Sequence, residues 1–93
     1  MKVVQMLGRT GKPVANQFTI FHNCCTYFQS YGVIVAKIDN GVTLDKVYWD
    51  YSRTTMKYLV KFLYPIVNNA TEIRNLVKSG KFKLDDLNDN LPF

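Results

Sequence analysis

Three basic residues recur at intervals of four near the middle of the chain: Arg53, Lys57 and Lys61. On a helix this spacing places them on one face, in a strip about 12 Å long at a rise of about 1.5 Å per residue. Tyr58 lies beside the strip in sequence, and its hydroxyl group can donate to a phosphate oxygen. The pattern predicts a surface that binds nucleic acid, and a solvated face that keeps the protein soluble is the competing interpretation.

The chain is also rich in aromatic residues, with Trp 1, Tyr 6 and Phe 6 among 93 residues. One small core does not bury all of them, so some are expected on the surface. There, Tyr and Trp anchor protein interfaces or stack on unpaired bases. We therefore add Tyr31 and Trp49 to Tyr58 and the basic strip as candidate residues for binding a partner or nucleic acid.

His22, Cys24 and Cys25 carry the imidazole and thiol groups of this chain. A structural zinc site needs four ligands in tetrahedral geometry, and adjacent cysteines do not both point at one ion that His22 also reaches. A Cys–His nucleophile pair would lack a group that orients the imidazole. A disulfide between neighbouring cysteines is strained, so we expect two free thiols in a reducing cytoplasm and no metal site.

Two further patterns match catalytic or nucleotide-binding motifs only in part. In GRTGKP, residues 8–13, two residues rather than four separate the glycines, and proline follows the lysine where a phosphate loop has Ser or Thr. Among the carboxylates, Asp39 falls in a turn and Asp50 is suited to cap a helix, so no pair is spaced to share a pocket. We therefore predict no catalytic residues and no cofactor, and we expect that the protein is not an enzyme.

Local patterns also predict the strands that must position these residues. Runs of β-branched and aromatic residues favour short strands. Asp39-Asn40-Gly41 favours a tight hairpin turn, because Asn and Gly tolerate positive φ. The expected strands cover residues 2–6, 17–22, 25–31, 33–38 and 42–44, with a short edge strand at 81–84.

Two amphipathic helices are expected after the hairpin. The first begins at Asp50 or Ser52, either of which can accept an orphan N–H, and it ends before Pro65. The second begins at Asn69, with Glu72 in the reciprocal position of a capping box, and Gly80 stops it. These elements predict an α+β fold: a small antiparallel sheet of four to five strands with two helices packed on one face.

Length and charge favour a single globular domain over residues 1–93. Residues 1–84 hold twelve Lys and Arg against four acids, a net charge of +8, and residues 85–93 hold three acids, a net charge of −3, for a total of +5. We therefore expect a basic body with an acidic C-terminal tail from about residue 85. No apolar run approaches the roughly 18 residues that span a bilayer, so we expect no membrane partner.

Four segments of the chain form a recognisable pattern: TYFQSY (26–31), KIDNGVTLD (37–45), YWDYSRTTMKYLVKFL (48–63) and LDDLN (84–88). Together they resemble a family of small bacteriophage and prophage proteins. The resemblance implies a viral protein that acts in the cytoplasm of a host bacterium, and it implies no mechanism. Small phage proteins without catalytic residues commonly bind and redirect a host factor, including components of antiviral defence.

We therefore expect a non-enzymatic interaction protein that binds and modulates a host protein or ribonucleoprotein, for example as an inhibitor of antiviral defence. The alternative is a small RNA- or DNA-binding module that uses the basic helix face formed by Arg53, Lys57 and Lys61. A homodimer is a further expectation, because an exposed sheet edge next to YFQSY can pair two copies.

Overall fold

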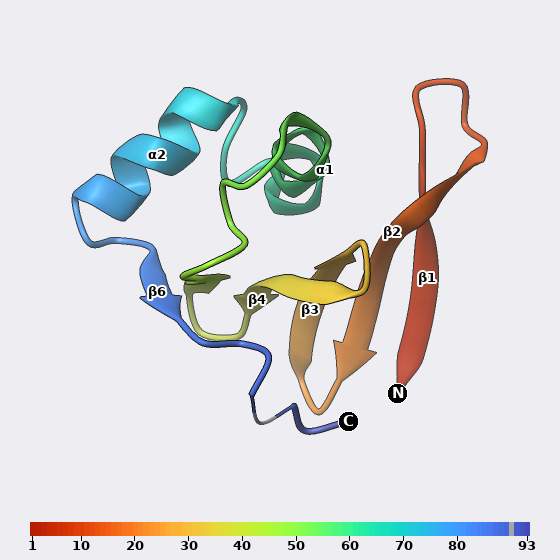
Figure 1. Cartoon of the computed structure of the whole chain (residues 1–93), viewed down its shortest axis with the longest axis horizontal. Helices are drawn as coiled ribbons and strands as arrows, with labels where there is room; N and C mark the ends of the chain where they lie inside the picture. Colours follow the sequence, from red (N-terminus) through yellow and green to blue (C-terminus); the bar gives the residue numbers. More distant parts are fainter. Residues whose placement is uncertain (90) are drawn as a thin grey trace.

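The computed structural model describes residues 1–89 and 91–93 and contains two helices and one open sheet of six strands (Figure 1). The predicted α+β class is confirmed, and the sheet has one strand more than the upper expectation of five. The elements are β1 (Lys2–Leu7), β2 (Pro13–His22), β3 (Cys25–Ser30), β4 (Val33–Ile38), β5 (Val42–Asp45), α1 (Arg53–Leu63), α2 (Ala70–Lys78) and β6 (Lys83–Asp85).

The strands lie side by side in chain order, from β1 at one edge to β6 at the other. Neighbours from β1 to β5 pair antiparallel through short turns, and β6 pairs parallel with β5. A parallel pair needs a long crossover, which the two helices supply here. The expectation of a purely antiparallel sheet is therefore wrong at its last strand.

Residues with positive φ make the tight turns of this meander. Asn23 (φ 48) and Cys24 (φ 64) join β2 to β3, and Tyr31 (φ 51) and Gly32 (φ 82) join β3 to β4. Two successive residues of this kind match the right-handed twist of paired strands. Tyr31 therefore lies in a turn, one residue beyond the strand in which the sequence pattern had placed it.

Ser52 is the residue that caps α1. Its Oγ atom accepts the backbone N–H of Thr55 at 3.1 Å, and the helix ends at Leu63, with Tyr64 as the C-cap residue before Pro65. The alternative cap, Asp50, instead accepts two hydrogen bonds from the guanidinium of Arg74, each of 3.2 Å. Of the two predicted caps only Ser52 is correct, because Asp50 is held by a residue of the second helix.

The start of α2 follows the predicted capping box with one change. Asn69 Oδ1 accepts the backbone N–H of Glu72 at 2.9 Å, whereas Glu72 Oε1 accepts the N–H of Asn68 at 3.1 Å rather than that of Asn69. After the helix, Gly80 has the predicted left-handed conformation with φ of 80°.

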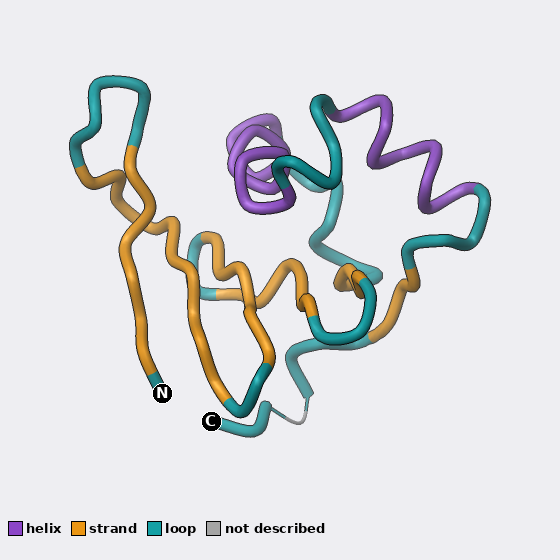
Figure 2. The backbone as a smooth tube through the Cα atoms, turned by 180° about the vertical axis from the view of Figure 1, so that it is seen from behind, coloured by secondary structure: helices purple, strands orange, loops and turns teal. Residues whose placement is uncertain are grey.

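Both helices cover the same face of the sheet, as Figures 1 and 2 show from opposite sides. Phe28 of β3 is fully buried there, and its ring stacks on Phe62 of α1 with centroids 5.5 Å apart. Leu59 and Leu63 of α1 and Ile73 of α2 are also fully buried. Each such side chain stabilises the fold by about 1.5–3 kcal/mol, so this layer is the main core.

The C-terminal segment covers the opposite face of the sheet. Ile20, Tyr27 and Ile34 form a second apolar cluster there, and Leu87 packs on it. The ring of Phe93 lies edge-to-face on Tyr27 at 5.0 Å between centroids. The predicted acidic tail therefore packs on the sheet through Leu87 and Phe93. Asn90, which belongs to that tail, lies outside the described residues.

The free edges of the sheet are at β1 and β6. The strand that carries YFQSY is β3, and it lies between β2 and β4. Both sides of β3 pair within the chain, so the edges open to a second copy are those of β1 and β6, and the homodimer stays a prediction.

Candidate nucleic-acid interface

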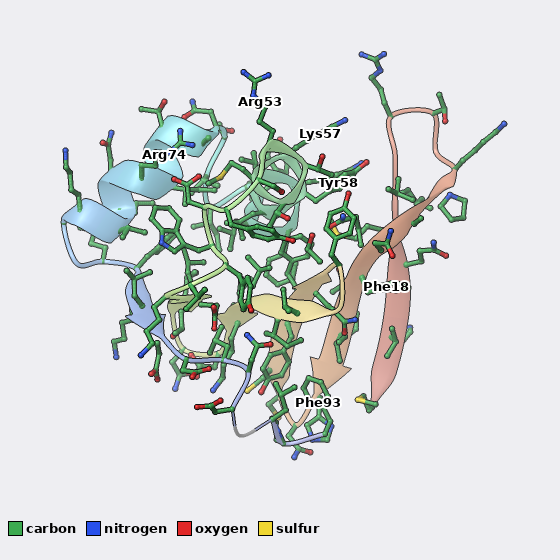
Figure 3. All side chains as sticks on the ribbon, viewed as in Figure 1. Phe18, Arg53, Lys57, Tyr58, Arg74 and Phe93 are labelled. Atoms are coloured by element: carbon green, nitrogen blue, oxygen red, sulfur yellow. The ribbon has the colours of Figure 1, made fainter. Side chains whose placement is uncertain are left out.

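The exposed side of α1 carries the predicted basic strip. Arg53, Lys57 and Lys61 are all exposed, and the first turn of the helix holds no acidic residue. Figure 3 shows the side chains of Arg53 and Lys57 extending away from the body of the protein. The helix forms because apolar residues on its other side, including Met56 and Leu59, are buried against the sheet.

Tyr58 does not share this exposed face. It is only 6% exposed and belongs to the main core, so its hydroxyl group is not presented to a ligand as the sequence pattern suggested. The Nζ atom of Lys57 lies 5.5 Å from the centroid of the Tyr58 ring. The ring therefore supports a neighbouring cation, an attraction typical of Lys over an aromatic face.

The loop between β1 and β2 extends the basic surface beyond α1. The Nζ atom of Lys61 donates to the backbone oxygen of Leu7, which brings the end of β1 against the helix. The loop itself is closed by a hydrogen bond of 2.8 Å from Gly8 N to Lys12 O. Two exposed basic residues of this loop, Arg9 and Lys12, are thereby added to the strip on α1. We call the whole set the basic surface: Arg9, Lys12, Arg53, Lys57 and Lys61.

Arg9 and Lys12 were not among the predicted site residues. A signal for them exists in the sequence, since residues 1–38 contain no Asp or Glu, and neither do residues 51–71. These two stretches supply the hairpin and α1. A stretch of basic residues without intervening acids is a usable sign of a shared positive surface once the two segments are known to meet.

The acidic residues of the tail lie away from this surface. Figure 1 shows the C-terminal segment on the far side of the sheet from both helices. Asp86 Oδ1 accepts the backbone N–H of Asn88 at 2.9 Å, and this hydrogen bond holds the pKa of Asp86 below its ordinary value. The tail carboxylates therefore serve local turns and do not neutralise the bases on α1.

Tyr31 lies at the end of the sheet that α1 covers. Its neighbour Ser30 is hydrogen-bonded through its hydroxyl group to the hydroxyl of Thr55 at 3.0 Å. The side chain of Tyr31 is 50% exposed. Tyr31 is therefore an exposed aromatic residue near the N-terminal half of α1.

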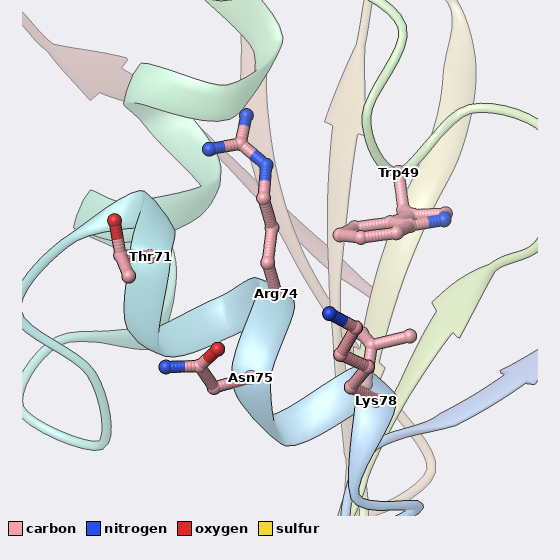
Figure 4. Close-up of a pocket in the computed structure, with 6 residues that line it drawn as sticks. Trp49, Thr71, Arg74, Asn75 and Lys78 are labelled. Atoms are coloured by element: carbon pink, nitrogen blue, oxygen red, sulfur yellow. The ribbon is translucent and has the colours of Figure 1, made fainter.

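Trp49 lies on the other side of α1, in the loop that leads from β5 to the helix. It is half-buried and lines an open hollow of about 440 Å³ against α2 (Figure 4). The remaining lining residues are Thr71, Arg74, Asn75, Val77 and Lys78. The hydrogen bonds that Asp50 accepts raise the pKa of Arg74, so this guanidinium stays charged beside the indole.

His22, Cys24 and Cys25 lie at and beside the turn between β2 and β3. Cys24 is an exposed free thiol and Cys25 a half-buried one, and the ring of His22 packs edge-to-face on Phe93 at 5.4 Å. Over residues 1–89 and 91–93, no three His, Cys, Asp or Glu side chains are grouped so that they could hold a metal ion. Within the same ranges neither helix is long and apolar enough to cross a membrane.

A protein-family model matches residues 1–80 of the chain, and its description is a family of unknown function, DUF8033. The chain belongs to DUF8033. The match includes residues 1–16, which lie before the segments that carry the resemblance to phage proteins. Neither the curated proteins nor the solved structures include a match to this DUF8033 chain.

The segments that carry the phage resemblance hold the DUF8033 fold together. Ser30 of TYFQSY bonds to Thr55 of the helix segment, and Ser52 caps that helix. Asp45, at the end of KIDNGVTLD, accepts the backbone N–H groups of Val47 and Tyr48 at 3.1 and 3.0 Å. These residues therefore form hydrogen bonds within the structure.

Proposed function

We propose that this DUF8033 protein is a non-enzymatic binding protein that attaches to nucleic acid, free or within a ribonucleoprotein, through the basic surface. The observation that carries the proposal is the contact between Lys61 and Leu7, which joins the bases of α1 to those of the β1–β2 loop. Two elements distant in sequence then present one positive surface, and both come from stretches without acids.

Phosphate groups suit this surface better than a single acidic side chain does. The strip on α1 is about 12 Å long, and the loop adds two further cations. An extended polyanion can therefore contact several basic side chains at once. Arg53 and Lys57 have no hydrogen-bond partner and no salt-bridge partner among the described residues, so binding phosphate breaks no bond of theirs within the protein.

The biological setting that we propose is the cytoplasm of a bacterium infected by a phage. It rests on the resemblance of four sequence segments to small phage proteins. The sequence suggested either a modulator of a host factor or a nucleic-acid-binding module. A host ribonucleoprotein as the target satisfies both, because the protein would modulate a host factor, including one of antiviral defence, by binding its nucleic acid.

Binding of a labelled single-stranded oligonucleotide, followed by fluorescence anisotropy, tests the proposal. With five phosphate contacts, the logarithm of the binding constant should fall with the logarithm of salt concentration at a slope of about −3 to −4. The double substitution Arg53→Glu with Lys57→Glu should abolish binding and leaves the contact of Lys61 with Leu7 in place.

The matched control is Lys81→Glu with Lys83→Glu, which changes the net charge by the same amount close to β6, at the far edge of the sheet. Equal losses in both double variants would point to net charge rather than to the basic surface. Binding that does not depend on salt, or no binding at micromolar protein, would contradict the proposal.

A protein partner is the second candidate, and the free edge at β1 favours it. Val3, Val4 and Leu7 of this strand are 52%, 40% and 48% exposed. An edge strand with one unpaired side and exposed apolar side chains can pair with a strand of another chain. Affinity purification from infected cells with and without nuclease separates the candidates, because a direct protein partner stays bound after the nucleic acid is digested.

A further inference from the structure

The hollow beside Trp49 lies outside the basic surface and has its own chemistry. One wall is the indole of Trp49, and the other is a side of α2 (Figure 4). Val77 adds apolar surface, and Lys78 brings a cation to the same opening, whereas the guanidinium of Arg74 is paired with Asp50. A flat aromatic wall with a cation beside it matches a ligand that is both planar and anionic.

Both walls are held in place by contacts within the protein. The backbone N–H of Trp49 donates to Asp45 O at 3.1 Å, and the side chain of Asp45 is almost fully buried. On the other wall, Asp50 holds the guanidinium of Arg74 by two hydrogen bonds of 3.2 Å. The backbone at Trp49 and the side chain of Arg74 are therefore held before a ligand binds, which lowers the entropic cost of binding.

The hollow lies near the N-terminal end of α1, where the basic surface begins. Asp50, which holds Arg74, lies three residues before Arg53, the first residue of α1. Lys78 and Arg74 of α2 line the hollow, and Arg53 begins the basic surface on α1.

We propose that this hollow binds one unstacked base of a single-stranded nucleic acid, with the base on the Trp49 indole and its phosphate at Lys78. This inference rests on the proposed function and narrows it to single strands. A base in a duplex is stacked on both sides and cannot lie on the indole, whereas a base in a single strand stacks freely on an aromatic side chain. The amide of Asn75 at the same opening can bond to a base edge.

Trp49 is the sole tryptophan of the chain, so its fluorescence reports on the hollow alone. The experiment titrates the full chain with a single-stranded oligonucleotide of about ten nucleotides and with a duplex of the same sequence. We expect the single strand to quench Trp49 fluorescence in step with the anisotropy signal. The duplex should change the anisotropy without quenching the indole.

Three variants make the test specific to the hollow. Trp49→Leu keeps an apolar side chain but loses stacking, and it should weaken binding of the single strand by about 5- to 100-fold with duplex binding unchanged. Trp49→Phe should recover part of the loss. Lys78→Ala keeps the indole and should weaken single-strand binding, whereas Lys81→Ala, a control outside the hollow, should not. Thermal melting shows whether each variant is folded.

The outcomes separate this inference from the proposed function. Single-strand binding that leaves the indole fluorescence and the Trp49→Leu affinity unchanged would overturn the inference, while loss of that binding in Arg53→Glu with Lys57→Glu would still support the basic surface. If no oligonucleotide binds, and a protein recovered by affinity purification covers Trp49 instead, both the proposed function and this inference are overturned. Quenching by the single strand, lost on nuclease treatment and reduced in Lys78→Ala, supports both.

Discussion

The side-chain amide of Asn88 donates to Oδ1 of Asp45 at 3.0 Å, across 43 residues of sequence. The same amide donates to the backbone oxygen of Ile34 at 3.0 Å, and its oxygen accepts the backbone N–H of Ile34 at 2.8 Å. Asp45 Oδ1 also accepts the N–H of Leu87 at 2.9 Å. These bonds fasten the C-terminal segment to the sheet and leave Leu87 packed on the second apolar cluster.

Asn88→Ala should therefore lower the free energy of unfolding by about 2–4 kcal/mol, because it leaves the backbone N–H and C=O of Ile34 without their partner and removes one of the two hydrogen bonds that Asp45 Oδ1 accepts. Urea denaturation measures the change. Asn75→Ala on the exposed side of α2 is the matched control and should be neutral or slightly stabilising, since Ala favours the helix. Equal effects of the two substitutions would mean that the Asn88 bonds contribute nothing.

Thr55→Val should destabilise the protein by about 1–3 kcal/mol, because the buried hydroxyl of Ser30 loses its partner at 3.0 Å. Ser30→Ala in the same background should recover part of that loss, since no unpaired hydroxyl then remains. A double-mutant cycle from thermal or urea unfolding gives the coupling. Strictly additive losses would argue against a bond between these two side chains.

Gln17→Met should stabilise the protein by about 1 kcal/mol or leave it unchanged, the reverse of a typical core substitution. Gln17 is fully buried on β2, and neither Nε2 nor Oε1 has a hydrogen-bond partner within the described residues. Met has a similar length and no polar group to desolvate. Clear destabilisation on urea unfolding would indicate that the amide has a partner in solution.

Stability should fall at alkaline pH because of Tyr27. Burial first and the neighbouring Cys25 second raise the pKa of Tyr27 above its ordinary value of 10.0. The folded chain then holds this proton more tightly than the unfolded chain. The resulting contribution to stability is fully present below pH 10.0 and is lost as the pH rises through the folded-state pKa.

Tyr27→Phe removes the ionising group and keeps the ring that Phe93 contacts. Its unfolding free energy should therefore drop less than that of the unaltered protein between about pH 9 and pH 11. Parallel curves for the two proteins would show that Tyr27 does not titrate differently on folding. The comparison cancels the titration of lysines, which both proteins share.

The caps and turns that the sequence predicted correctly depend on hydrogen bonds between residues close together in sequence. The Ser52 cap and the Asn69 cap each span three residues, and the Asp39 turn spans two. Such bonds depend on residue type and local backbone alone. For this reason the strands, the hairpin and the helix limits were predictable within one or two residues for most elements.

The errors concern residues whose role depends on distant partners. Asp50 is a good cap by type, but Arg74, 24 residues later, takes its carboxylate. Tyr58 lies next to the basic strip in sequence, yet it is buried in the main core, beside the β1–β2 hairpin. The parallel position of β6 likewise depends on where two helices return the chain. None of these contacts has a local signal.

By itself, the sequence determined the α+β class, most element limits, the excess of positive charge and the bases on α1, because each follows from residue type and short-range spacing. Only the tertiary structure decided that the β1–β2 loop joins these bases, that the acidic tail docks on the opposite face, and that Trp49 lies opposite Arg74 and Lys78. Surfaces of this kind are formed by segments far apart in the chain, and packing of the core alone brings them together.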